Sequence, residues 1–231
     1  MIGSLIIPFM GFAFVTVKAR LPPRRGIFWI PSAYKNTKYI LLIVSLFFIF
    51  IGMFTPLFYL PTYAVAQGMS PSLAGYLLAI LNAASTFGRI IPGILANRYG
   101  RLNIFSIGEI VAGIVIFCMS SASSDAVLIV YAIVFGFVSG TIISSASAAL
   151  SLFSENLQDV GTYMGIGMSI SAPGGLIGPP VNGALVKTYG GFFEVSMFSG
   201  TMCVLGGCIA LAAKVTNSSG VFSTTYGGST F

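Results

Sequence analysis

Arg89 is the only charged residue in the apolar segment 73–96. A guanidinium keeps its charge in proteins, so placing it among lipid-facing side chains is costly unless it meets a partner, a cavity or the interface. Helical spacing puts Asn82, Ser85 and Thr86 on the same polar side as Arg89. Such a side is typical of a helix that lines a water-filled cavity, where a guanidinium can hold a carboxylate through two parallel hydrogen bonds. The alternative is that Arg89 reaches the membrane interface, roughly 10 Å away at ~1.5 Å per residue.

Other polar features interrupt the apolar segments. Glu109 is the one acid well inside such a segment, and it suits a proton site, an arginine partner or an interfacial role. Pro56 and Pro61 each remove a backbone donor close to Phe58, which either bends the segment toward a cavity or serves packing.

Enzymatic and metal chemistry find little support in this composition. The chain has no histidine and five acidic residues, and its three cysteines lie in apolar runs without metal-ligand spacing. No nucleophile, base and orienting group can be assembled from the spacing. We therefore expect no enzymatic activity, no metal and no other cofactor. The net charge of +6 comes mostly from two short clusters rather than a basic face, so we expect no nucleic-acid partner.

The composition predicts an integral membrane protein, with the lipid bilayer as its surroundings. Hydrophobic residues make up 56% of the 231 residues and charged residues 7%, and the mean hydropathy is +0.96. Segments long enough to cross roughly 30 Å of hydrocarbon predict one short span and six full ones, joined by turns rich in Gly, Ser, Pro and Asp. The expected spans are 2–17 (short), 39–65, 73–96, 103–121, 126–153, 161–186 and 192–213.

Basic residues give the expected orientation. They gather in the segment 18–38 and near the segment 98–101, and one more follows the last span, whereas only Lys187 lies at the other side. The positive-inside rule therefore predicts that these segments and the C-terminus are cytoplasmic. The Ser/Thr/Gly-rich tail 214–231 is expected to be disordered. We expect the plasma membrane rather than an internal one.

The segment GILANRYGR at residues 93–101 resembles the GxxxDRxGR signature of the major facilitator superfamily, in the copy that joins helices eight and nine. Asn97 stands where the family usually has aspartate, so the charge pair of that signature is lost. The residues that this resemblance implicates in a conformational latch are Gly93, Asn97, Arg98, Gly100 and Arg101.

Further segments resemble the monocarboxylate-porter branch of that superfamily. Residues 54–64 resemble its helix seven, Phe87-Gly88-Arg89 the arginine end of its helix eight, and Gly178-Pro179-Pro180 with Gly183 its helix eleven. The resemblance implies an all-α, polytopic transmembrane helix bundle: the C-terminal six-helix half of a major facilitator fold plus a partial preceding helix. Its expected parts are a partial helix six (1–17), a basic linker (18–38), the six-helix half (39–213) and the tail (214–231).

The resemblance also implies site roles. Arg89 would bind the substrate carboxylate, with Asn82, Ser85, Thr86 and Phe58 around it. Ser85 occupies the position where those porters commonly have an aspartate that acts in proton coupling. The glycines and prolines of segment 161–186 favour a deformable helix that acts as a gating hinge. These candidates are Pro173, Gly174, Gly178, Pro179 and Pro180.

Together these features predict a secondary active transporter, or a fragment of one, for a small organic anion such as a monocarboxylate, working by alternating access. The expected partners are that anion and a missing N-terminal half or another half-transporter. The competing hypothesis is a truncated, non-transporting membrane protein that associates with another half or partner.

Overall fold

A computed structural model describes residues 11–12, 16, 34, 36–154 and 159–215, with the side chains of Asn97 and Val215 outside the description. The expected partial helix 1–17, the linker 18–38 and the tail 214–231 therefore lie largely outside the described residues, and these predictions stay untested. The described part consists of helices and the turns between them, without a strand. The predicted all-α class is confirmed.

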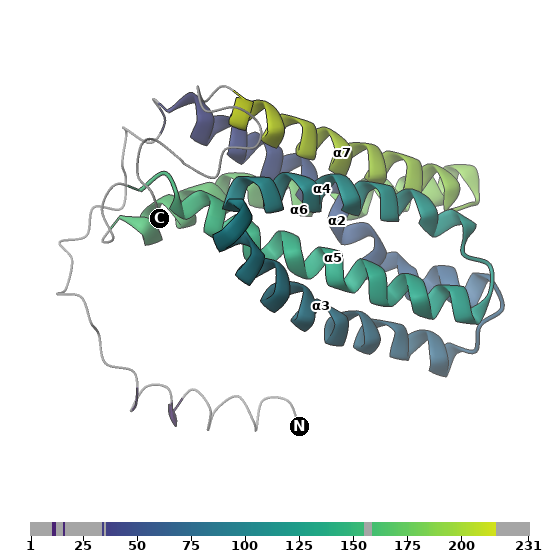
Figure 1. Cartoon of the computed structure of the whole chain (residues 1–231). Helices are drawn as coiled ribbons and strands as arrows, with labels where there is room; N and C mark the ends of the chain where they lie inside the picture. The colour runs from purple at the N-terminus through teal and green to yellow at the C-terminus, as the bar shows by residue number, and fades with distance from the viewer. Residues whose placement is uncertain (1–10, 13–15, 17–33, 35, 155–158, 216–231) are drawn as a thin grey trace.

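In the described part of the chain, six long helices run side by side in one bundle (Figure 1). Their bounds are close to those predicted from hydropathy, because each is a long apolar run ended by Gly, Ser, Pro or Asp. They are α2 (Thr37–Ala66), α3 (Pro71–Tyr99), α4 (Arg101–Phe117), α5 (Asp125–Ser151), α6 (Val160–Tyr189) and α7 (Phe193–Val215), and a 3₁₀ turn, η2 (Cys118–Ser121), extends α4.

Among the described helices, five are long and apolar enough to cross a membrane, namely α2, α3, α4 with η2, α5 and α7. Helix α6 has the length, at 30 residues, but it is not among these five because Gly, Pro and Ser residues are interspersed with its apolar residues. It is nevertheless one continuous helix over Val160–Tyr189, so the interruptions expected at its glycines and prolines do not break it.

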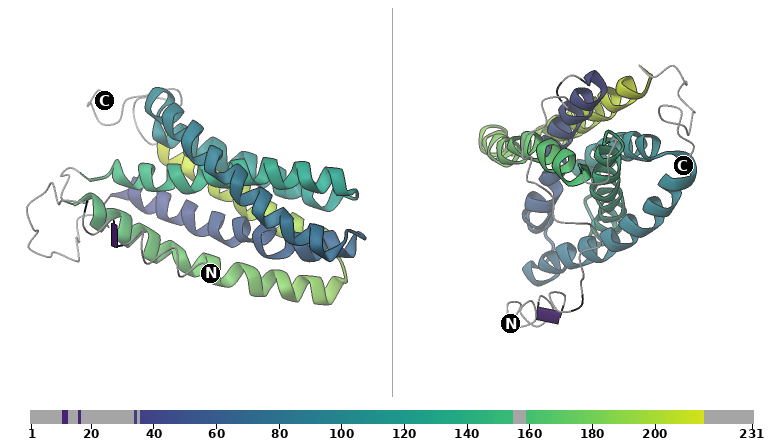
Figure 2. Two further views of the ribbon diagram at one scale, coloured as in Figure 1. Left: turned by 90° about the horizontal axis from the view of Figure 1, so that it is seen from below. Right: turned by 90° about the vertical axis from the view of Figure 1, so that its left-hand side faces the viewer.

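Neighbouring helices in space are not always neighbours in sequence. Helix α5 packs between α3 and α4, and α7 packs between α4 and α2. Helix α6 packs against α2. The views in Figure 2 show α3 along the outside of the bundle, crossing its neighbours at an angle. Its main contact is with α5, which positions the polar side chains of α3.

The contact between α3 and α5 is unusually close because glycines remove the side chains there. A Cβ atom at Gly88 would lie 1.9 Å from the Phe137 carbonyl oxygen, and one at Gly140 would lie 2.2 Å from the Ser85 carbonyl oxygen. The small residues of α5 thus form a helix-packing face against α3. The backbone of α3 is held directly against α5 at the level of Arg89.

The ends of α3 are set by local sequence. Ser70 caps its start by accepting a hydrogen bond from the Leu73 amide at 3.4 Å, and Pro71 occupies the first turn. At its end, Gly100 turns the chain into α4 with φ +90°, a conformation that only glycine adopts without strain. The segment expected as a loop is thus helical up to Tyr99, and a single residue forms the corner.

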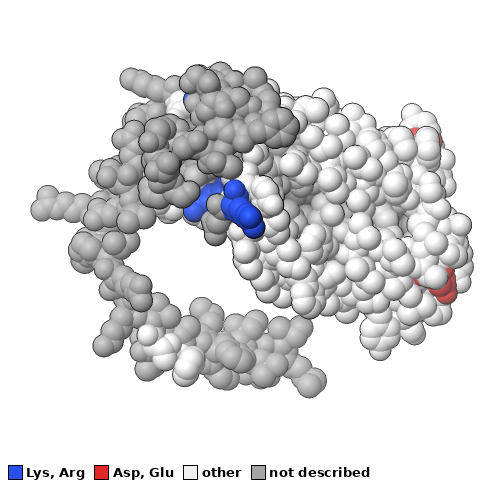
Figure 3. All heavy atoms as spheres, viewed as in Figure 1, with Lys and Arg blue, Asp and Glu red and all other residues white. Residues whose placement is uncertain are grey.

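Charges collect at the two ends of the bundle. One end, where α3 and α7 finish and α4 begins, carries Arg98, Arg101 and Lys214. The other end, where α5 and α7 begin, carries Asp125 and Glu194. Figure 3 shows an uncharged surface between blue atoms at one end and red atoms at the opposite end. This distribution suits a protein whose middle is embedded in hydrocarbon.

Candidate functional site

Helix α3 presents three different faces along its length. One face packs on α5, a second is exposed and apolar, and the third, between them, is exposed or half-buried and polar. The apolar face carries Tyr76, Phe87, Ile90 and Ile94, which are 55–67% exposed. We call the third face the polar stripe; its members recur every three or four residues and are Asn82, Thr86, Arg89 and Gly93.

Arg89 extends from the polar stripe and is exposed. Within the described residues, its guanidinium has no hydrogen-bond or ion-pair partner. The Asn82 amide donates to the Leu78 carbonyl at 2.9 Å, and the Thr86 hydroxyl donates to the Asn82 carbonyl at 3.3 Å. Both neighbours donate a hydrogen bond to their own helix, whereas no donor of the Arg89 guanidinium is bonded to a described residue, so Arg89 is the strongest available donor on this face.

The structure separates Ser85 from the other predicted site residues. Ser85 is 6% exposed, its hydroxyl donates to the Asn82 carbonyl at 2.8 Å, and its backbone lies against Gly140. It therefore contributes to the contact with α5 rather than to the polar stripe.

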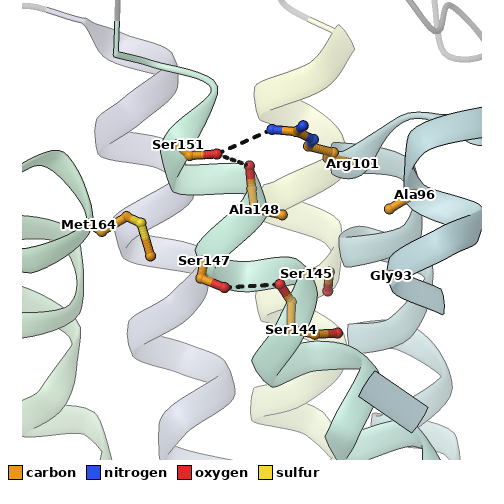
Figure 4. Close-up of a pocket in the computed structure, with 9 residues that line it drawn as sticks. All are labelled: Gly93, Ala96, Arg101, Ser144, Ser145, Ser147, Ala148, Ser151 and Met164. Carbon is orange, nitrogen blue, oxygen red and sulfur yellow. Dashed lines mark hydrogen bonds between the residues drawn. The ribbon is translucent and has the colours of Figure 1, made fainter. Parts of the chain in front are cut away.

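A pocket of about 330 Å³ continues from the end of the polar stripe. Gly93, one turn beyond Arg89, is on its wall, and Arg101 from the start of α4 reaches it (Figure 4). The remaining wall comes mainly from α5 and is rich in serine, so we call it the serine pocket. Its lining residues are Gly93, Ala96, Arg101, Ser144, Ser145, Ser147, Ala148, Ser151 and Met164.

The serines of this pocket use their protons on their own helix. Ser144 and Ser145 donate to the Thr141 carbonyl at 3.1 and 2.6 Å, and Ser147 donates to the Ser144 carbonyl at 3.0 Å. Ser151 donates to the Ala148 carbonyl at 2.8 Å. The oxygen lone pairs of these serines remain available to accept hydrogen bonds from a ligand. The hydrogen-bond donors of the pocket come from the Arg101 guanidinium, which donates to the Ser151 oxygen at 3.3 Å.

Phe58 lies on α2 at the end of a row of aromatic rings. The ring centroids of Phe50 and Phe54 are 5.9 Å apart, and those of Phe54 and Phe58 are 6.2 Å apart. Phe58 is 61% exposed. Counted at ~1.5 Å per residue from the turn that joins α2 to α3, Phe54 and Asn82 lie at about the same depth.

The predicted latch residues lie around the corner between α3 and α4. Arg98 is exposed, with its guanidinium carbon 6.0 Å from the centre of the Tyr99 ring. Gly100 makes the turn, and Arg101 contacts α5 through Ser151. Gly93 lines the pocket, and the Asn97 side chain lies outside the description.

The predicted hinge residues lie where α6 packs on α2. Cβ atoms at Gly174 and Gly178 would lie 2.4 Å from the Phe47 carbonyl oxygen and 2.2 Å from the Ile51 carbonyl oxygen. The Tyr59 hydroxyl donates to the carbonyl of Pro179 at 2.8 Å. Pro173 and Pro180 lie in the same helix without ending it.

Sequence reasoning missed a buried polar triad that links three helices. The Asn182 amide of α6 donates to the Thr55 hydroxyl of α2 at 2.6 Å. The Ser199 hydroxyl of α7 donates to the Asn182 oxygen at 3.2 Å and lies 2.6 Å from the Thr55 hydroxyl. All three side chains are fully buried. The only sequence signal was Asn182 itself, a strongly polar residue inside a predicted membrane span.

The fold and the polar stripe together define a polytopic membrane protein whose helices carry polar side chains along an exposed face. The sequence matches the Major Facilitator Superfamily over residues 40–222. The chain belongs to this superfamily, and it is an integral, multi-pass membrane protein.

Curated relatives agree with this assignment. The chain is 42% identical over 219 residues to the Aspyridones efflux protein apdF of Emericella nidulans, covering 95% of this chain and 45% of that protein. It is 32% identical over 216 residues to the Agnestins efflux protein AgnL12 of Paecilomyces divaricatus, covering 91% and 49%. It is 36% identical over 217 residues to the MFS transporter asaE of Aspergillus flavus, covering 91% and 49%.

The chain therefore spans about half the length of the curated relatives it matches. Two of these relatives are named for efflux of particular compounds, and none of the three is named as a monocarboxylate porter. The resemblance to the superfamily is confirmed, and its monocarboxylate-porter branch stays a prediction.

Proposed function

We propose that this chain forms the C-terminal six-helix half of an exporter that carries a small organic anion across the membrane by alternating access. Helices α2 to α7 would then correspond to helices seven to twelve of a complete transporter, with the substrate path between the two halves. Membership of the superfamily, the six-helix bundle and the match to about half of each relative support this correspondence.

The proposal rests on Arg89, an exposed cation without a described partner. A permanent cation on a membrane-spanning helix needs either a partner or water, and no described side chain bonds to it. The polar stripe and the serine pocket provide a polar surface that leads from Arg89 to the end of the bundle where Arg101 lies. An anion could reach Arg89 along this surface, and its binding there would complete the hydrogen bonds of the guanidinium.

The apolar part of the substrate would contact α2. The row of Phe50, Phe54 and Phe58 on α2, in which the Phe54 ring also lies against Gly175 of α6, would offer an apolar surface to the body of an anion held by the polar stripe. A carboxylate attached to an aromatic or apolar group fits this combination better than a small hydrophilic acid. Two relatives are named for the efflux of aspyridones and agnestins, which supports outward movement of an organic compound.

We assign the conformational change to the latch residues at the corner between α3 and α4 and to the hinge residues of α6. Contact between Arg101 and Ser151 ties the start of α4 to the end of α5. Gly174 and Gly178 allow α6 to lie directly against α2, so a small shift of α6 would expose or cover the path. Both contacts border surfaces that must rearrange when the two halves rock.

A chimera tests the proposal. The segment of the Emericella nidulans relative that matches this chain is replaced by the chain itself, and export of an aromatic monocarboxylate is measured in cells that produce the chimera. We expect export by the chimera, at least a tenfold loss with Arg89→Gln, and partial activity with Arg89→Lys, because lysine keeps the charge but loses the bidentate geometry.

The matched control is Lys187→Gln, which removes an exposed cation from the other end of the bundle and should leave export unchanged. Membrane levels of all variants are compared by immunoblot. Normal export by Arg89→Gln at an equal membrane level would refute the role of Arg89. A chimera that inserts but exports nothing would favour the non-transporting alternative.

A further inference from the structure

Glu109 lies inside the helix bundle and belongs neither to the polar stripe nor to the serine pocket that form the proposed transport path. It is fully buried on α4. Its carboxyl group has one described hydrogen-bond partner, the Ser45 hydroxyl of α2, at 2.8 Å from Oε2 and 3.1 Å from Oε1. Ser45 is also fully buried, so the pair joins α2 to α4 away from water.

Helix α7 closes the third side of this pair. A Cβ atom at Gly206 would lie 3.0 Å from the Ser45 carbonyl oxygen and 3.6 Å from Glu109 Oε2. One at Gly207 would lie 3.2 Å from the Glu109 Cβ atom. Cys203, one turn earlier on α7, is fully buried as well. The carboxyl group therefore faces glycine backbone of α7 and the Ser45 hydroxyl, neither of which carries a charge, while the nearby Cys203 thiol lies 3.9 Å from the Ile49 carbonyl oxygen.

Cations at the nearby end of the bundle have other partners. Lys214 of α7 donates to the Asn103 side chain, and Arg101 donates to Ser151. In the part of the chain that the structure describes, no ion pair involves Glu109. Helix α5 packs on the other side of α4, where Thr141 and Ile142 meet Gly108. No packed helix thus brings a compensating charge to this carboxyl group.

This environment suits the neutral form of a carboxyl group. An ionised carboxylate needs several donors or a cation to offset its lost hydration, and Ser45 offers one proton. A carboxylic acid brings its own proton, so the acid and the hydroxyl can each take one role in a hydrogen bond. Glu109 is also the only acidic residue away from the helix ends among those described, since Asp125, Asp159 and Glu194 lie at helix starts.

We propose that Glu109 and Ser45 form a proton-binding site that holds α2 against α4 and α7. The proton stays on Glu109 while the three helices are packed as described here. When α2 moves away and water enters, the O–H bond of the carboxylic acid breaks and the proton passes to water, which leaves a hydrated carboxylate. Repacking then requires that the proton return. This inference concerns the chain itself and does not depend on the proposed substrate.

Infrared spectroscopy of the chain reconstituted in lipid vesicles tests the site directly. At neutral pH, exposed carboxyl groups are ionised, so a carbonyl-stretch band of a protonated carboxyl should come from Glu109. We expect Glu109→Gln to remove this band and Ser45→Ala to shift it, because the hydrogen bond to the carboxyl group is lost. Glu194→Gln, at the end of the bundle, is the matched control and should leave the band in place.

A neutral-pH spectrum without a protonated-carboxyl band, or a band that persists in Glu109→Gln, would overturn the proposal. If Glu109→Gln does not fold, the shift in the Ser45→Ala spectrum decides alone, since that variant keeps the carboxyl group. An unshifted band would then show that the protonated carboxyl group is not Glu109.

The chimera described above provides a second readout. With Glu109→Gln, which carries a permanently neutral side chain, we expect export to lose its dependence on a pH gradient while exchange of labelled for unlabelled anion continues. Unchanged dependence on the gradient would refute proton release from Glu109 during the transport cycle. Absence of any export in the unmodified chimera would count against the proposed function and leave the infrared result standing.

Discussion

Arg89 and Glu109 are both ionisable residues within long apolar helices, and the bundle surrounds them differently. Arg89 is exposed on the polar stripe without a described partner, whereas Glu109 is fully buried against Ser45. A guanidinium cannot shed its charge, so Arg89 must find an anion or water. A carboxyl group can be neutral, so Glu109 can remain inside. This difference in chemistry supports the proposed ligand binding by Arg89 and the proposed proton binding by Glu109.

At the residue scale, the triad of Thr55, Asn182 and Ser199 gives a stability prediction. Asn182→Leu keeps the side-chain size but removes two hydrogen bonds between helices. Such bonds in membranes contribute about 0.6 kcal/mol each on average and up to about 1.7 kcal/mol. We therefore expect a loss of about 1–3 kcal/mol, seen as a lower Tm in detergent.

Asn82→Leu is the matched control for this prediction. The Asn82 amide donates only to its own helix, at the Leu78 carbonyl, and it lies on an exposed face. We expect its Tm to stay close to that of the unmodified chain. Equal effects of the two substitutions would show that the buried triad contributes no specific stability.

At the scale of elements, the helices were predictable and their contacts were not. Hydropathy and turn residues located all six long helices, because a span of the bilayer requires a long apolar run. The polar side of α3 was also foreseen from helical spacing, except that Ser85 faces α5. Partners such as Ser45 and Glu109 lie 64 residues apart, and no local pattern indicates which helices meet. The serine pocket was missed for the same reason, since it needs α3, α4, α5 and α6 together.

Two glycines on α3 test how this helix is held. A Cβ atom at Gly88 would lie 1.9 Å from the Phe137 carbonyl oxygen, whereas one at Gly75 would have nothing within 4 Å. Gly88→Ala should therefore push α3 away from α5 and cost about 1–3 kcal/mol, as overpacking does in protein interiors. Gly75→Ala, the same substitution in the same helix, should be neutral or slightly stabilising, because alanine favours the helix.

The measurement for this pair is the thermal stability of each variant in detergent, followed by size-exclusion chromatography. Because Gly88 precedes Arg89, the displaced helix should also misplace the guanidinium, so export by the Gly88→Ala chimera should fall. Equal Tm values for the two alanine variants would mean that α3 and α5 do not pack as closely as described.

At the scale of the whole molecule, the two ends of the bundle differ in charge. Arg98, Arg101 and Lys214 lie at one end, and Asp125 and Glu194 lie at the other (Figure 3). Cations are enriched on the cytoplasmic side of membrane proteins. The serine pocket lies at the cationic end, next to Arg101. In an exporter, this is the side from which an anion would enter, and the cations would attract it.

Cysteine labelling tests this orientation. In a chain without its three native cysteines, a cysteine is introduced at Lys187 or at Arg98, both of which are exposed near opposite ends of the bundle. With intact cells and a membrane-impermeant maleimide, we expect labelling of Lys187→Cys, and labelling of Arg98→Cys only after the membrane is permeabilised. Both positions are exposed, so a difference before permeabilisation reports sidedness. The reverse pattern would place the cationic end outside, and the serine pocket would then be the exit of the path rather than its entrance.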